Sequence, residues 1–161
     1  MARFEEEVRI TPSVLDRLID YEPEVTQEPI ASRSKSLRQL KQSVKRDLEW
    51  LLNTRQVAGG LPPGLKETNR SLAAYGLPDF TTISIRNEDD QELMRRAITT
   101  AIKILEPRLE GVTVTIEPLY EGELMMHFRI DARLKVDPAP EAVTFDTVLD
   151  PIHHQYVVQG D

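Results

Sequence analysis

The spacing of apolar residues divides the chain into helices followed by strands. Apolar side chains recur at helical spacing over residues 36–53 and again from about residue 88 to 106. Beyond that point the spacing changes to every second residue. The change is clearest over 124–136, where apolar positions alternate with charged ones. Such a period is typical of a strand with one buried face and one wet face.

Shorter segments with the same alternation lie on both sides of this strand. They cover residues 112–117, 143–149 and 156–158, and residues 120–123 can form a hairpin turn. Helices followed by a run of strands predict the α+β class. We therefore expect two main helices packed on one face of a three- to four-stranded antiparallel sheet, with the other face toward water.

Local signals place the ends of the helices. Ser34 or Ser36 can cap the first helix, which we expect to stop at Asn53. Asn87 is the expected N-cap of the second helix. Pro107 ends that helix, because proline lacks the amide hydrogen that the next helical bond needs.

A single domain with an N-terminal arm accounts for the 161 residues, which suffice for one hydrophobic core. We assign residues 1–33 to the arm, partly helical and ordered by a partner, and residues 34–161 to one α+β domain. The arm has one apolar patch, with Ser13 or Thr11 available as its N-cap. Its residues are Val14, Leu15, Leu18 and Ile19.

Two further features, the Trp50 side chain and the long connection 54–80, are not explained by the expected helices and strands. Trp50 lies off the apolar stripe of its helix, and we expect the arm or the following loop, rather than a partner, to cover it. The connection 54–80 contains the break GGLPPG at 59–64. It is long for a loop without structure, so we expect it to wrap the domain or to serve function.

Composition narrows the function. The chain has no cysteine, which excludes disulfides and thiolate metal sites. Its net charge of -7 disfavours a general nucleic-acid-binding role. Seven basic residues against two acidic ones in residues 33–55 could still contact RNA, although a solvated helix face is the better interpretation. The sequence shows neither a secretory signal nor an apolar span of ~18 residues, so we expect a cytoplasmic protein without membrane insertion.

Candidate catalytic carboxylates cluster near the expected hairpin. They are Glu117, Glu121 and Glu123. A hydrolase needs two carboxylates across a cleft, one with a raised pKa, whereas turn carboxylates are usually solvated. We therefore expect no catalytic pair here.

The histidines give no metal site. His127 falls on the polar face of the long strand, where a solvated role is expected. His153 and His154 are adjacent, and neighbours on a strand point to opposite faces, so they cannot easily chelate one ion. We predict no enzyme activity, no cofactor and no metal.

The sequence Glu106-Pro107-Arg108 marks the corner between the second helix and the sheet. Proline fixes the backbone there, and the two charged side chains can pair with each other or with a partner. Considered alone, this is a helix end with a surface ion pair worth ~0–1 kcal/mol.

Several segments together resemble the TssE family, the baseplate wedge proteins of type VI secretion systems. That family is similar to a small wedge protein of contractile phage baseplates that carries the label "lysozyme-like". The similar segments are SVLDRL at 13–18, SVKRDLEWLLNTR at 43–55, YGLPDF at 75–80, EPRL at 106–109 and the alternating strand 124–136.

The resemblance implies a structural role in the baseplate. Glu106, Pro107 and Arg108 would be the partner-binding residues, in contact with the core of the wedge formed by TssF and TssG. The sheet would have the handshake fold of sheath subunits, so the sheath proteins TssB and TssC would join by strand exchange. TssK is a further candidate partner. The baseplate would dock at the cytoplasmic side of the inner membrane complex.

Two other functions remain as alternatives. One is a peptidoglycan hydrolase, which the label "lysozyme-like" suggests and which would need facing carboxylates in a cleft. The other is a nucleic-acid-binding module built on the basic segment 33–55, whose retention on DNA or RNA would depend on salt.

Overall fold

A computed structural model describes residues 10, 12–19, 24, 33–57, 59–62, 64–84, 86–118, 125–150 and 152–160. The α+β class is confirmed. The helices are α1 (Val14–Leu18), α2 (Arg33–Asn53) and α3 (Glu88–Leu105), with short 3₁₀ turns at Thr68–Arg70 and Leu72–Ala74. The strands are β1 (Leu109–Ile116), β2 (Met126–Leu134), β3 (Glu141–Asp150) and β4 (Gln155–Gly160).

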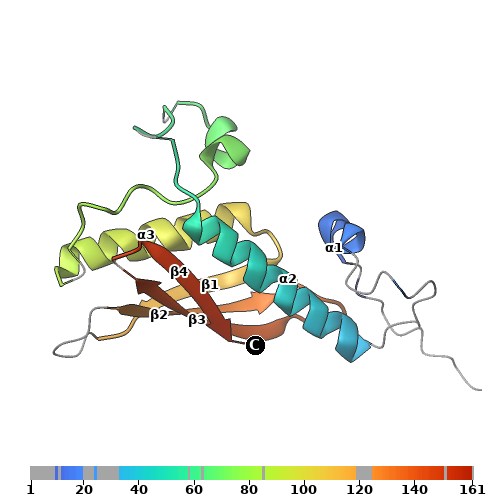
Figure 1. The fold of residues 1–161 in the computed structure, drawn as a ribbon. Coiled ribbons are helices and arrows are strands. Elements are labelled where there is room, and N and C mark those ends of the chain that lie inside the picture. Colours follow the sequence, from blue (N-terminus) through green and yellow to red (C-terminus); the bar gives the residue numbers. More distant parts are fainter. Residues whose placement is uncertain are drawn as a thin grey trace, which may run out of the picture.

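The strands form one four-stranded antiparallel sheet in the order β1-β2-β3-β4. Figure 1 shows α2 and α3 crossing over the same face of this sheet. Helix α3 packs on β1, and α2 packs on β4. The expected arrangement of two main helices on one face of an antiparallel meander is therefore confirmed.

The core lies between the helices and the inner face of the sheet. In β2 every second residue is buried, from Met126 to Leu134, as the alternation predicted. Val44 and Leu48 of α2 and Ile102 of α3 lose all exposure against this face. Burial of such side chains contributes about 1.5–3 kcal/mol each, so this layer dominates the stability of the domain.

The polar face carries ion pairs that connect neighbouring strands. Arg129 of β2 lies 3.2 Å from Asp146 of β3 and 3.5 Å from Glu117. All three side chains are at least about half exposed, so each pair contributes little to stability.

Element ends agree with most of the local signals. Asn87 caps α3, because its side-chain oxygen accepts a hydrogen bond of 2.9 Å from the amide of Asp89. Ser13 likewise caps α1. The expected caps at Ser34 and Ser36 are wrong, since α2 already begins at Arg33 and Ser36 is buried within it. The expected turn at 120–123 lies outside the described residues.

Asn53 does more than end α2. Its side-chain amide donates to the carbonyl of Tyr156 at 2.8 Å, and its side-chain oxygen accepts from the amide of the same residue at 2.8 Å. Both backbone groups belong to β4. This pair of bonds fixes the end of α2 against the edge of the sheet, where its polar side chain replaces a strand partner.

Trp50 remains 51% exposed, so the expectation that the arm or the following loop covers it is wrong. Within the described residues, the guanidinium of Arg46 lies over the indole ring, 5.1 Å from its centroid. A cation above an aromatic face is attracted to it, but it leaves most of the ring accessible.

The connection after α2 folds back on itself. Backbone bonds join Leu77 to Thr54 at 2.8 Å and Gln56 to Leu77 at 2.9 Å. The side chain of Gln56 donates to the carbonyls of Ala74 and Gly76. This segment therefore closes as a tied loop beside the end of α2 (Figure 1).

Within the part of the chain that the structure describes, no helix is long and apolar enough to cross a bilayer.

Gly76→Ala should lower the free energy of unfolding by about 2–4 kcal/mol, because Gly76 has a positive φ of 104° and an added Cβ would lie 2.3 Å from the Thr54 carbonyl oxygen. Urea unfolding would measure it. Gly64→Ala is the matched control, because nothing lies within 4 Å of an added Cβ there. Equal effects of the two changes would contradict this assignment.

Thr147→Val should raise the free energy of unfolding by about 1 kcal/mol. The Thr147 hydroxyl faces the core, and among the described residues it has no hydrogen-bond partner. Valine has the same shape without the unpaired polar group. Thr144→Val is the control and should not stabilise, since the Thr144 hydroxyl donates to Asp131 at 2.8 Å. Thermal or urea unfolding of both variants measures whether each change raises or lowers the free energy of unfolding.

Candidate functional site

The E-P-R corner (Glu106, Pro107 and Arg108) forms where α3 meets β1. Glu106 caps the C-terminus of α3, since its amide donates to the carbonyl of Ile102 at 2.9 Å. Lys135, just after β2, holds the corner from the other side. Its amide donates to the carbonyl of Arg108 and its ammonium to the carbonyl of Pro107, both at 2.8 Å. The corner is therefore held at both ends.

Glu106 and Arg108 pair with each other within this corner. The carboxylate of Glu106 accepts from the amide of Arg108 at 3.2 Å and from its Nε at 2.6 Å. Its second oxygen accepts from Nη2 of Arg108, so the pair is bidentate. Glu106 is only 4% exposed. The expectation of a surface ion pair is therefore wrong, because one partner is buried.

The corner also reaches α2. Nη2 of Arg108 lies 2.6 Å from Oδ2 of Asp47, and Nη1 donates to the hydroxyl of Ser43 at 3.3 Å. The other oxygen of Asp47 accepts from Arg46 at 2.8 Å. Arg108 thus connects the end of α3 to the middle of α2, through groups far apart in the sequence.

Helix α1 joins the same group through one carboxylate. Asp16 accepts from Nη2 of Arg46 at 2.9 Å and from the hydroxyl of Ser43 at 2.6 Å. Within α1, the hydroxyl of Ser13 also donates to Asp16. The complete group, called the corner cluster below, consists of Asp16, Ser43, Arg46, Asp47, Glu106 and Arg108.

Electrostatics favour the charged forms of Arg108 and Asp16 in the corner cluster. Hydrogen bonds with Glu106 raise the pKa of Arg108, and those with Asp47 add to the effect, although burial opposes it. Burial acts to raise the pKa of Asp16, but hydrogen bonds from Ser13, Ser43 and Arg46 outweigh it and leave that pKa below its ordinary value. The cluster therefore contains three carboxylates against two guanidiniums.

Sequence reasoning found only part of this cluster. It identified Glu106 and Arg108 and allowed them to pair, and the structure brings them together. It counted Arg46 and Asp47 in a basic, solvated helix face and gave Ser43 no role of its own. Their spacing of i, i+3 and i+4 was the available signal, because it puts them on one face of α2. Only the fold places Asp16 of the arm beside them.

Apolar side chains are exposed on the elements that carry the cluster. Val14 is 73% and Leu18 is 76% exposed on α1, and α1 has no buried residue. Trp50, one turn beyond Arg46 and Asp47 on α2, adds an exposed aromatic ring. Exposed apolar groups beside a rigid charged group are typical of a protein-binding surface.

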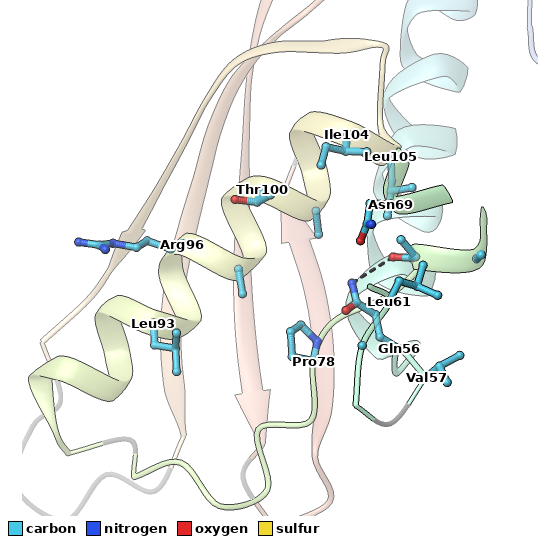
Figure 2. A pocket seen from close by; sticks show the side chains of 15 residues that line it. Gln56, Val57, Leu61, Asn69, Pro78, Leu93, Arg96, Thr100, Ile104 and Leu105 are labelled. Carbon is cyan, nitrogen blue, oxygen red and sulfur yellow. Dashed lines mark hydrogen bonds between the residues drawn. The ribbon is translucent and has the colours of Figure 1, made fainter. Parts of the chain in front are cut away.

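A groove of about 420 Å³ lies between α3 and the tied connection. Leu93 and Ile104 of α3 and Val57 and Leu61 of the connection are among the residues that line it (Figure 2). Its lining is mostly apolar. The one charged side chain in it, Arg96, pairs with Glu92 at 2.6 Å. This groove offers no nucleophile and base arrangement that could carry a reaction.

The other candidate chemical groups lie apart. Glu117 is paired with Arg129, while Glu121 and Glu123 lie outside the described residues. His153 lies 2.6 Å from Asp150, in the turn before β4. Across the described ranges, no three acidic, histidine or cysteine side chains are placed to hold a metal ion.

Glu106→Gln should lower the free energy of unfolding by about 2 kcal/mol, because Arg108 would lose its charged partner next to the core. Glu110→Gln is the matched control. Glu110 pairs with Arg133 at 3.2 Å, but both side chains are largely or partly exposed, so about 0.5 kcal/mol or less is expected. Urea unfolding of both variants measures the difference, and equal losses would show that burial of Glu106 has no role.

Comparison with known proteins places this site in context. Residues 38–139, more than half of the chain, match the family model described as "Baseplate wedge protein gp25". Among solved structures, one similar chain comes from "The baseplate complex from the type VI secretion system". It is 23% identical, with a TM-score of 0.48, and the match covers 69% of this chain and 94% of that one. No curated protein matches the chain. The family match includes the E-P-R corner and most of α2, and by it the chain belongs to the baseplate wedge protein gp25 family.

Proposed function

We propose that this chain is a structural wedge component of a type VI secretion baseplate, which docks on TssF and TssG through the E-P-R corner. Membership of the baseplate wedge family supports the wedge role. The observation that carries the docking site is the corner cluster, which holds Arg108 in a fixed orientation before any partner arrives. A preorganised cation loses little conformational entropy on binding.

The three corner residues have different roles in this proposal. The side chain of Arg108 is 25% exposed, and Pro107 is exposed beside it, so these two can touch a partner. Glu106 is buried and fully engaged by Arg108, so it positions the guanidinium rather than contacting the partner itself. The bonds to Glu106, Asp47 and Ser43 use four of the five N–H groups of Arg108, so one N–H of Nη1 can donate to a carboxylate or carbonyl of the partner.

The sheet supplies a second kind of contact, strand exchange with the sheath proteins TssB and TssC. Among the described residues, no strand pairs with the outer edge of β1 or of β4. Strand β1 has a register shift between Glu110 and Thr113, with Gly111 at a positive φ, and such a bulge interrupts regular pairing. Strand β4 has no register shift, but Asn53 already engages the amide and the carbonyl of Tyr156, and Gly160 has a positive φ. An added strand would therefore pair along the part of this edge between Tyr156 and Gly160.

This role places the chain in the cytoplasm, where the baseplate would dock at the inner membrane complex, with TssK as a further partner. The two alternatives lack a supporting observation. Among the described residues, no carboxylate lines the groove between α3 and the tied connection. In the basic helix, Arg46 is already neutralised by Asp16 and Asp47 rather than offered to a phosphate.

Arg108→Glu should abolish co-elution with a TssF–TssG complex in size-exclusion chromatography after co-expression, because it reverses the charge at the centre of the docking site. Arg133→Glu is the control. Arg133, in β2, also pairs with a glutamate, Glu110, but its side chain lies on the polar face of the sheet. That variant should co-elute like the parent chain.

Circular dichroism should first show that both variants are folded. Co-elution of the Arg108→Glu variant would reject the corner as the docking site. Separate elution of the parent chain as a monomer would reject the wedge role itself, and a cell-wall hydrolysis assay would then be the next test.

A further inference from the structure

The attachment of α1 to the domain is unusual in its chemistry. The helix has no buried residue, and its apolar side chains Val14 and Leu18 point to solvent. Among the described residues, the hydrogen bonds that join it to α2 are those that Ser43 and Arg46 donate to Asp16. A segment held by polar bonds without apolar burial opens at a low free-energy cost.

The groups that hold Asp16 also hold Arg108. The hydroxyl of Ser43 donates to Asp16 and accepts from Nη1 of Arg108. By a second route, Nη2 of Arg46 is shared between Asp16 at 2.9 Å and Asp47 at 2.8 Å, and Asp47 in turn lies 2.6 Å from Arg108. The first route from α1 to the E-P-R corner passes through one side chain, Ser43, and the second passes through two, Arg46 and Asp47.

We infer that the hydrogen bonds that attach α1 to α2 depend on the position of Arg108. We call α1, attached in this way, a polar latch. When Arg108 turns toward another anion, Asp47 loses that guanidinium and attracts Arg46 more strongly. The hydrogen bond from Arg46 to Asp16 then weakens. The Ser43 hydroxyl also loses the hydrogen bond from Arg108 that helps to fix its orientation. The carboxylate of Asp16 is left in a cluster with an excess of negative charge, and α1 is released.

The consequence is a link between the corner and the arm. Anything that draws Arg108 out of the cluster frees α1, and with it the exposed apolar side chains of Val14 and Leu18. The coupling is a property of the free chain, so it can be tested without any baseplate partner. Because the two effects are reciprocal, a change that frees α1 must also loosen Arg108.

The chain suits a fluorescence test, because it contains one tryptophan and no cysteine. Trp50 lies one helical turn beyond Arg46, and its ring is half exposed. A dansyl group on Val14→Cys, at a site 73% exposed, accepts energy from Trp50. The transfer efficiency reports whether α1 is held beside α2.

Asp16→Asn in the labelled chain should lose most of the energy transfer, because the carboxylate is the anchor. Arg17→Gln is the matched control. It removes a charge from the same helix, but Arg17 is exposed and does not belong to the corner cluster, so transfer should be unchanged. Unchanged transfer in the Asp16→Asn chain would overturn the latch.

Arg108→Gln should also lose most of the transfer, although Arg108 does not touch Asp16 directly. Arg133→Gln, on the polar face of the sheet, should not. Circular dichroism of each labelled chain confirms that the domain is folded. If Asp16→Asn lowers the transfer and Arg108→Gln leaves it at the parent value, then α1 is anchored but uncoupled, and the inference is wrong.

Discussion

The guanidinium of Arg108 joins three separate parts of this chain. It binds Glu106 at the end of α3, Asp47 in the middle of α2 and, through Ser43, the carboxylate of α1. Since Arg108 itself stands just before β1, the same side chain relates both helices to the first strand of the sheet. A lysine could not replace it, because a single ammonium cannot form a bidentate pair with one carboxylate and still reach a second.

Such a partly buried ion cluster contributes more to orientation than to stability. Removing charges from water costs free energy, and their mutual attraction compensates only when the geometry is good. The apolar layer between helices and sheet supplies the stability here, with Phe128 and Phe145 among its largest buried side chains. The cluster lies beside that layer and selects one arrangement of α2 and α3. The proposed docking would benefit from this, because the charged group is already in position.

The sequence predicted what depends on local pattern. The alternation in β2 and the heavily apolar face of α3 each reflect one buried side, so class, element order and sheet type could be inferred from them. Asn87 acts on an amide two residues away, so its capping role was also visible. The corner cluster was different. Asp16 and Arg46 are 30 residues apart and meet only because the arm returns to α2.

The exposure of Trp50 is a second feature that local sequence patterns could not predict. Its place off the apolar stripe was clear, but whether the chain covers it depends on where the arm and the connection go. The connection turns instead toward α3, where Gln56 and the tight turn at Gly76 tie it down. The arm is held at Asp16, one to two turns before the indole along α2, and the guanidinium of Arg46 lies over the ring. An aromatic ring left open beside a preorganised cation is what a protein partner can use, since aromatic and arginine side chains contribute strongly to interfaces. Under the proposed docking role, the uncovered ring and the engaged arginine would form parts of one binding surface.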